Sequence, residues 1–171
     1  MDQNSAATPT KIIAIILGSK NDWPKVQQVI SEYTADKVRI VVHVISCHRN
    51  PYEVVAFAEG SDYFDAVICV GGKAFALPGV LDAFIHANGK KTPVIGVALG
   101  KADATNEGLA ALLSIEQLPG QPVIMDGQDP YLGPEGLGLA IEHVIANRLP
   151  APKERQEKPA ELEIYKNFDG G

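Results

Sequence analysis

The sequence predicts an α/β domain with a three-layer, flavodoxin-like fold, built on a five-stranded parallel sheet with strand order 2-1-3-4-5. Short runs rich in β-branched residues alternate with segments whose apolar residues recur at helical spacing. The strand-like runs are apolar almost throughout, which is typical of parallel strands covered by helices on both faces. Five such units fit into about 140 residues, a length that favours a doubly wound sheet.

The predicted strands open each unit. They are Lys11–Leu17, Val38–Ile45, Ala66–Val70, Pro93–Val97 and Pro122–Met125. The longest uninterrupted apolar run, Ile12–Leu17, is far shorter than the roughly 20 residues of a membrane-spanning helix. We therefore expect no membrane partner.

The first predicted helix follows the first strand. Four apolar residues recur there at the spacing i, i+3, i+4 and i+7 and so share one helical face. They are Val26, Val29, Ile30 and Tyr33. Asp22 stands where an N-cap is expected.

The second predicted helix has stronger start signals. Asn50 is expected as its N-cap, Pro51 as its first residue and Glu53 at the third position, close to a capping box. The unbonded backbone N–H groups of this helix end would then point back at the end of the second strand.

Three further helices complete the predicted units. They are expected at Leu81–Ala87, Glu107–Ile115 and Leu137–Arg148. The pair Asn88–Gly89 ends the first of them. The turn Asp129–Pro134 precedes the last.

Length and composition indicate one domain. The chain has 171 residues, of which 46% are apolar, enough for a sizeable core. We expect residues 11–148 to form the domain, residues 1–10 a disordered N-terminal segment, and residues 149–171 a C-terminal tail. Two interpretations of the tail stay open: its aromatic side chains dock on a neighbouring subunit, or it is flexible.

Charge and cysteine content exclude several classes of partner. The formal net charge of −6 argues against nucleic acid and anionic membrane surfaces. Two cysteines form no disulfide framework, and the polar N-terminus is no secretory signal, so we expect a cytoplasmic protein. The four histidines lack paired spacing and no C-x-x-C occurs, so we expect no metal site.

In open α/β sheets, ligands bind beyond the carboxyl ends of the strands, near the point where the strand order reverses. In the predicted order this point lies between strands 1 and 3. Three loops follow the strands there: Leu17–Pro24, Ser46–Pro51 and Val70–Gly79. Their glycines, hydroxyls and arginine suit a phosphorylated ligand.

Each loop offers specific groups. Gly18 allows close backbone approach, and Ser19 supplies a hydroxyl ahead of a helix N-terminus. Asp22 either caps the helix or binds a sugar hydroxyl. Arg49 offers a fork of donors for phosphate. The pair Gly71–Gly72 can bring backbone N–H groups against a ligand.

His48 is the candidate acid/base, because histidine titrates near neutral pH and this one stands at the expected ligand end of the sheet. The alternative is a loop histidine bonded to a backbone carbonyl. Cys47 raises a nucleophile hypothesis, but adjacent side chains at an extended strand end point apart, which disfavours a Cys–His pair. Cys69 lies in a buried-looking strand and is expected to be a small core residue.

Three motifs together carry a resemblance. LGSKNDW, SCHRNP and the LPG of VGGKAFALPG, in this order and spacing, resemble the family of 5-(carboxyamino)imidazole ribonucleotide mutases and phosphoribosylaminoimidazole carboxylases, enzymes of purine biosynthesis. The resemblance covers roughly Lys11–Arg148. It continues in SIEQLPGQPV, residues 114–123, which is similar to the family's penultimate loop and last strand.

The resemblance implies a nucleotide-binding catalytic domain assembled into a homo-octamer. It implies a ribonucleotide and carbon dioxide as small-molecule partners, and no metal, ATP or organic cofactor. In the mutase, a carboxylate leaves the exocyclic amine of the imidazole nucleotide as carbon dioxide and is re-added to a ring carbon. His48 matches the family histidine that moves the proton between nitrogen and carbon, a role that fits general acid–base catalysis.

The same match assigns the substrate-binding residues. The ribose and phosphate would be held by the first two loops, the base and carbon dioxide by the third. The residues implied are Gly18, Ser19, Asn21, Asp22, Ser46, Arg49, Gly71, Gly72 and Lys73.

The third loop departs from the family pattern GAGGAAHLPG. Lys73 falls in place of a glycine, Phe75 in place of an alanine, and Ala76 in place of a second histidine. Phe75 and Lys73 would reshape or block the pocket, or Lys73 would act as a cation for the migrating carboxylate; its other interpretation is a solvated side chain. Smaller departures are Cys47 for an alanine and Asn50 for a threonine.

Several functions therefore stay open at this point. The mutase and the direct carboxylase share these motifs. A divergent relative acting on another ribonucleotide is the alternative that the third loop favours. A nucleotide-binding module without turnover, which keeps Ser19, Ser46 and Arg49 but no longer needs His48, is the alternative from another class.

Overall fold

The computed structural model describes residues 10–33, 37–100, 106–120, 122–127 and 129–150. The N-terminal segment 1–9 and the tail 151–171 lie outside the described residues, so the expectations for them stay predictions. Within the described part, no helix is long and apolar enough to cross a bilayer.

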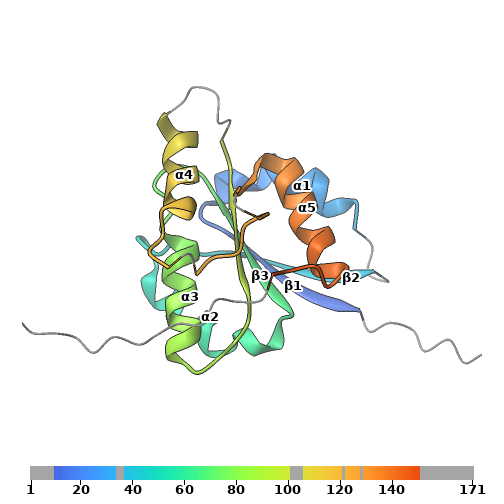
Figure 1. The fold of residues 1–171 in the computed structure, drawn as a ribbon, viewed down its shortest axis with the longest axis horizontal. Coiled ribbons are helices and arrows are strands. Elements are labelled where there is room, and N and C mark those ends of the chain that lie inside the picture. The colour runs from blue at the N-terminus through green and yellow to red at the C-terminus, as the bar shows by residue number, and fades with distance from the viewer. Residues whose placement is uncertain (1–9, 34–36, 101–105, 121, 128, 151–171) are drawn as a thin grey trace, which may run out of the picture.

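Five parallel strands form one sheet in the order β2-β1-β3-β4-β5, as predicted. Their bounds are Lys11–Leu17 for β1, Val38–Val44 for β2, Ala66–Gly71 for β3, Val94–Ala98 for β4 and Tyr131–Leu132 for β5. The strand order reverses between β1 and β3 (Figure 1). The carboxyl ends of β1, β2 and β3 therefore meet at one edge of the sheet.

Helices cover both faces of this sheet (Figure 1). On one face lie α1 (Trp23–Ser31) and α5 (Gly133–Ile145), which pack together. On the other lie α2 (Pro51–Glu59), α3 (Leu77–Ala87) and α4 (Asn106–Glu116). Two short 3-10 helices, η1 (Lys20–Asp22) and η2 (Ser61–Tyr63), precede α1 and β3.

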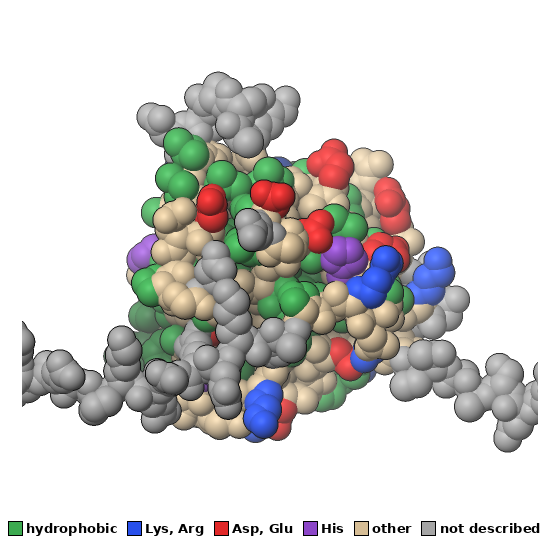
Figure 2. Space-filling view, viewed as in Figure 1, with side chains coloured by type: hydrophobic (Ala, Val, Ile, Leu, Met, Phe, Trp, Pro, Cys, Tyr) green, Lys and Arg blue, Asp and Glu red, His purple; other side chains and the backbone are tan. Residues whose placement is uncertain are grey.

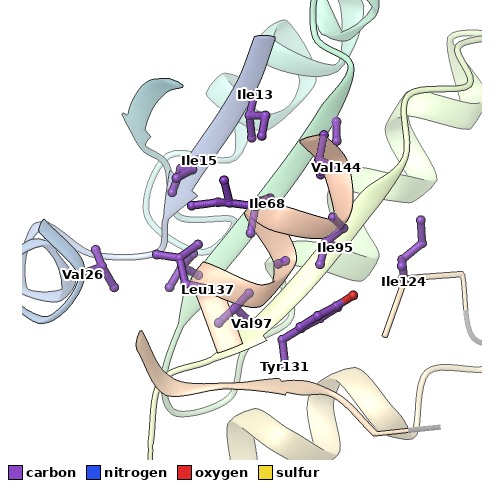
Figure 3. Close-up of a cluster of buried hydrophobic side chains, with 14 of the residues drawn as sticks. Ile13, Ile15, Val26, Ile68, Ile95, Val97, Ile124, Tyr131, Leu137 and Val144 are labelled. Carbon is purple, nitrogen blue, oxygen red and sulfur yellow. The ribbon is translucent and has the colours of Figure 1, made fainter. Parts of the chain in front are cut away.

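The core consists of two layers, because successive residues of a strand face opposite sides of the sheet. Ile13 and Ile15 of β1 pack with Ile68 of β3 toward Leu137 of α5 (Figure 3). Their neighbour Ile16 faces the other layer, under α2, α3 and α4. Each of these side chains is fully buried, which contributes about 1.5–3 kcal/mol per residue.

The prediction for the fifth strand was wrong. The apolar run Pro122–Met125 makes a single bridge to β4, between Ile124 and Ile95, and the strand proper is Tyr131–Leu132, inside the segment predicted as a turn. An antiparallel bridge between Asp126 and Asp129 lies between the two. The edge of β4 is thus shared by two short segments, which hydrophobicity alone does not distinguish.

Two helices begin earlier than predicted. Helix α3 begins at Leu77 rather than Leu81, and α5 at Gly133 rather than Leu137. In both cases a proline stands near the first helical position. The N–H that proline lacks would have no partner in the first turn of a helix anyway. The residues Leu-Pro-Gly and Gly-Pro therefore form the first turns of α3 and α5 instead of preceding these helices.

His43, near the carboxyl end of β2, lies in an aromatic cluster and is not part of the lining of the cleft at that edge. Its ring packs edge-on against Phe57 at 5.2 Å and Phe64 at 6.2 Å between centroids. Within the described part of the chain its buried Nε2 has no hydrogen-bond partner. Burial lowers the pKa of His43 below its ordinary value.

This burial predicts a pH dependence of stability. The unfolded chain binds a proton at His43 more readily than the folded chain, so the contribution of neutral His43 is fully present above the unfolded pKa of about 6.5 and is lost as pH falls through the lowered folded pKa. Urea unfolding of the wild type and of His43→Phe at pH 7.5 and pH 5 measures this dependence. We expect the free energy of unfolding to fall more in the wild type than in His43→Phe when the pH is lowered to 5. Equal losses would show that His43 does not cause the dependence.

Candidate active site

A cleft of about 450 Å³ opens at the carboxyl ends of β1, β2 and β3. All ten residues that the sequence and its resemblance pick out line this cleft. They are Gly18, Ser19, Asn21, Asp22, Ser46, His48, Arg49, Gly71, Gly72 and Lys73. Basic side chains are scattered rather than gathered on the face shown in Figure 2.

The first loop turns sharply after β1. The Gly18 amide donates to the Val70 carbonyl at 3.0 Å, which ties the loop to β3. The Ser19 hydroxyl caps η1 by accepting from the Asn21 amide at 3.3 Å. Asp22 is 7% exposed and makes no capping bond to α1; its carboxylate pairs with Lys25 at 3.2 Å. Asp22 thus stands at the N-cap position of α1, as predicted, but without a side-chain capping bond, and it lines the cleft.

The second loop is a hydrogen-bonded turn. The Ser46 carbonyl accepts from the amides of Arg49 and Asn50 at 3.2 and 2.9 Å. Asn50 stands at the N-cap of α2 and Pro51 follows it, as predicted, but no side-chain capping bond forms. Instead the Asn50 Oδ1 accepts from the Ser46 amide at 2.8 Å. The amide side chain closes the turn that carries His48.

Arg49 connects the first two loops. Its Nη2 donates to the Gly18 carbonyl at 2.7 Å. A guanidinium carries five N–H donors in a planar fork, so this bond orients the group without exhausting it. The guanidinium is thereby held beside the backbone of the first loop, within the lining of the cleft.

Cys47 and His48 do not point apart as expected. The Cys47 Sγ lies 3.8 Å from the His48 Nδ1. The residues lie in a turn rather than an extended strand end, so alternation of side chains does not apply. Burial raises the pKa of the Cys47 thiol, which disfavours the thiolate that nucleophilic attack requires. Cys69 is fully buried, as expected of a core residue.

The third loop runs from the end of β3 to α3 against the backbone of β4. A Cβ on Gly72 would lie 2.8 Å from the Leu99 carbonyl oxygen, so only glycine fits this approach. Lys73 adopts a left-handed backbone conformation with φ of 60°. That conformation costs a residue with a Cβ roughly 1–2 kcal/mol and is free for glycine, the residue that the family pattern has here.

Phe75 does not block the cleft. Its side chain is 4% exposed and packs into the core beneath the loops. The ring lies so close to Gly71 that a Cβ there would be 2.5 Å from Phe75 Cε2. The same ring lies 3.6 Å from the Cβ position of Gly18. Phe75 therefore supports the first and third loops from below, and the cleft stays open above it.

Two lining residues escaped the sequence analysis. Lys25 reaches the cleft from the first turn of α1, and Leu99 from the end of β4. The spacing of Lys25 three residues after Asp22 on a helix is a signal that could have found it. Leu99 carries no comparable signal. Among the described residues, no group of three His, Cys, Asp or Glu side chains is arranged to hold a metal ion.

Comparisons with known proteins agree with the geometry. The sequence matches the family described as AIR carboxylase over residues 12–150. It is 34% identical over 149 residues to the N5-carboxyaminoimidazole ribonucleotide mutase of Pyrococcus abyssi, covering 85% of this chain and 80% of that protein. It is 38% identical over 114 residues to the enzyme of the same name from Mycobacterium leprae, covering 65% of this chain and 63% of that protein.

A solved structure agrees on the fold. Treponema denticola PurE superimposes with a TM-score of 0.57 over 80% of this chain and 85% of its own, at 20% sequence identity. The family match extends over β1 to α5, the whole unit whose three loops form the cleft. The protein is thus a member of the AIR carboxylase family.

Proposed function

We propose that this protein is an N5-carboxyaminoimidazole ribonucleotide mutase of purine biosynthesis. The observation that carries the proposal is the placement of His48 in the same cleft as the hydroxyls and guanidinium of the first two loops. That cleft lies at the switch point of the sheet, where ligands of such folds bind. The similarity to the N5-carboxyaminoimidazole ribonucleotide mutases of Pyrococcus abyssi and Mycobacterium leprae supports the same activity.

The two ends of the cleft take different parts of the nucleotide. The ribose and phosphate lie against the first two loops, where Ser19, Ser46 and Arg49 offer hydroxyl and guanidinium donors. Asp22, buried beside Lys25, accepts from a ribose hydroxyl. The imidazole base then lies against the third loop, next to His48.

His48 moves one proton in each half of the reaction. Cleavage of the exocyclic nitrogen–carbon bond leaves its electron pair on nitrogen, and protonated His48 donates a proton there as carbon dioxide departs. The ring carbon then attacks carbon dioxide through its π electrons. Neutral His48 removes the proton from that carbon, which restores the aromatic ring of the nucleotide and returns His48 to its protonated form. Atoms and charges balance without a further reactant.

Lys73 is proposed to bind the migrating carboxylate. It lines the cleft and holds a left-handed backbone conformation that a glycine would hold without cost. Strain of this kind is concentrated at functional sites. A cation here would favour the carboxylate at both ends of its transfer. Four further properties are proposed from the family. Carbon dioxide is the small partner molecule, no organic cofactor takes part, and the protein is a homo-octamer in the cytoplasm.

A turnover assay tests the proposal. The purified protein is mixed with freshly prepared 5-(carboxyamino)imidazole ribonucleotide, without ATP, and formation of the ring-carboxylated product is followed. We expect product at a rate well above the uncatalysed rate. A parallel assay supplies the uncarboxylated nucleotide with excess bicarbonate and carbon dioxide.

The parallel assay distinguishes the proposed mutase from the second candidate function, which is that of a direct carboxylase or a divergent relative. The observation that favours it is the altered third loop, in which Lys73, Phe75 and Ala76 all depart from the family pattern. Turnover only in the presence of bicarbonate and carbon dioxide would select the direct carboxylase. Turnover in neither assay, with the nucleotide bound, would select a divergent relative or a binding module.

The phosphate assignment predicts a loss of affinity. Hydrogen bonds to charged groups contribute about 1.5–3 kcal/mol, so Arg49→Ala is expected to weaken binding of the uncarboxylated nucleotide about 10- to 100-fold. Isothermal titration calorimetry measures the dissociation constant. Arg39→Ala is the matched control, because Arg39 on β2 donates to the Tyr63 hydroxyl of η2 and does not line the cleft. An unchanged constant for Arg49→Ala would refute the assignment.

A further inference from the structure

Ser114 connects α4 to the third loop through one hydroxyl group. Its Oγ donates to the Ala110 carbonyl one turn earlier in the helix, at 2.6 Å. The same oxygen accepts from the Phe75 backbone amide at 3.1 Å. The donor bond orients the hydroxyl so that its lone pairs face the loop. The two residues are 39 positions apart in sequence, so this is a tertiary tether.

The tether holds a segment whose own backbone is strained. Lys73, two residues before Phe75, is in the left-handed region, and the Ala76 amide closes a tight turn on the Ala74 carbonyl at 3.1 Å. Strained conformations persist only where the surroundings over-determine them. The hydroxyl of Ser114 is one such constraint, applied directly to the backbone between Lys73 and α3.

Phe75 transmits this constraint to the cleft. Its amide is bonded to Ser114, while its ring supports Gly71 and Gly18 from below. A shift of the Phe75 backbone would therefore move the glycines on both sides of the site. The backbone bond and the buried ring thus both restrain the same residue.

Ser114 itself lies just outside the cleft. It lines an open, largely apolar groove of about 500 Å³ between α3 and α4, together with Leu113 and Val80. His48 and Ala76 line both the groove and the cleft. Ser114 thus contacts the third loop from the side of the groove, and it does not line the cleft.

We propose that Ser114 is a positioning residue for the acid–base step of the proposed mutase, holding the third loop at the working distance from His48. The inference rests on the proposed function. Because the phosphate end of the nucleotide lies against the first two loops, loss of the tether moves the base and carbon dioxide relative to His48 and leaves the phosphate anchored. A displacement of about 1 Å at a reacting centre can cost about 100-fold in rate.

The experiment compares three substitutions at position 114 in the full chain. Ser114→Ala removes the acceptor; we expect kcat to fall about 10- to 100-fold, while the dissociation constant of the uncarboxylated nucleotide changes much less. Ser114→Thr keeps the hydroxyl and is expected to restore most of kcat. Ser114→Cys retains a weak sulfur acceptor and is expected to lie between them.

The control is Ser31→Ala. Ser31 also donates back to its own helix, to the Gln28 carbonyl at 2.6 Å, but on α1 and outside the lining of the cleft. We expect wild-type kcat. Thermal unfolding of each variant establishes that it is folded at the assay temperature. If Ser114→Ala does not fold, the order of kcat among wild type, Thr and Cys decides the question.

Each outcome has one meaning. Wild-type turnover with equal kcat in Ser114→Ala, or with Ser114→Thr as slow as Ser114→Ala, overturns the inference and leaves the proposed function standing. A proportional loss of affinity and kcat also overturns it, since it would indicate a general loosening of the site. Absence of wild-type turnover overturns the proposed function and the inference with it.

Discussion

Replacement of His48 with asparagine is expected to lower turnover about 100- to 10,000-fold, the usual contribution of a general acid–base group. Asparagine keeps a hydrogen-bonding side chain of similar reach but cannot exchange a proton near neutral pH. The affinity for the uncarboxylated nucleotide is expected to stay within a few fold, because Arg49 and the hydroxyls of Ser19 and Ser46 are unchanged. Steady-state kinetics and calorimetry on the same preparation measure the two quantities.

His86→Asn is the matched control for this substitution. His86 lies on α3, where its Nδ1 contacts the Asp82 carbonyl at 3.0 Å, and it does not line the cleft. We expect it to keep wild-type turnover. If His48→Asn also keeps turnover, His48 is not the acid/base. If the wild type binds the nucleotide without turnover and His48→Asn binds equally well, the protein is a divergent relative or a binding module, and not a mutase.

Replacement of Phe75 with alanine is expected to lower the free energy of unfolding by about 3–5 kcal/mol, the range for deleting a buried aromatic ring. The family pattern has alanine at this position, so resemblance alone would predict a harmless change. In this protein the ring is 4% exposed and fills the space beneath Gly71 and Gly18. Its removal leaves a cavity under the site, and the loops above it lose their support.

Urea unfolding measures the effect of Phe75→Ala. Phe75→Leu refills part of the space and is expected to cost less. Phe84→Ala is the matched control, because Phe84 on α3 is 37% exposed and loses less buried area. A loss of under about 1 kcal/mol for Phe75→Ala would show that the loops collapse onto the space without cost, contrary to the packing described.

The third loop shows how the departures from the family pattern fit together. Lys73 carries a backbone cost that glycine would avoid, and the burial of Phe75 stabilises the same segment by an amount that more than offsets it. The polar part of the site is held separately: Arg49 donates to the Gly18 carbonyl, and the side-chain oxygen of Asn50 accepts from the Ser46 backbone amide. The loop can thus differ from the pattern while the rest of the site is kept.

Much of the fold followed from local pattern. The strands β1 to β4 were predicted within a residue or so of their ends, because buried parallel strands are continuous apolar runs. The strand order followed from the number of units and the rules for doubly wound sheets, and it was confirmed. The fifth strand was not predictable in this way, because a short edge segment has no distinctive apolar pattern. The starts of α3 and α5 were not predictable either, because proline occurs both in turns and in the first turn of a helix.

For the site, the sequence by itself determined which three loops meet, because every loop that follows a parallel strand emerges at the same edge of the sheet. Together with the family resemblance it also picked out ten of the residues that line the cleft. Only the tertiary structure decided how the loops are held. The bond from Arg49 to Gly18, the ring of Phe75 under Gly71, and the hydroxyl of Ser114 on the Phe75 amide join residues distant or unpatterned in sequence. Such contacts depend on the packing of side chains from separate elements, and packing leaves no periodic trace along the chain.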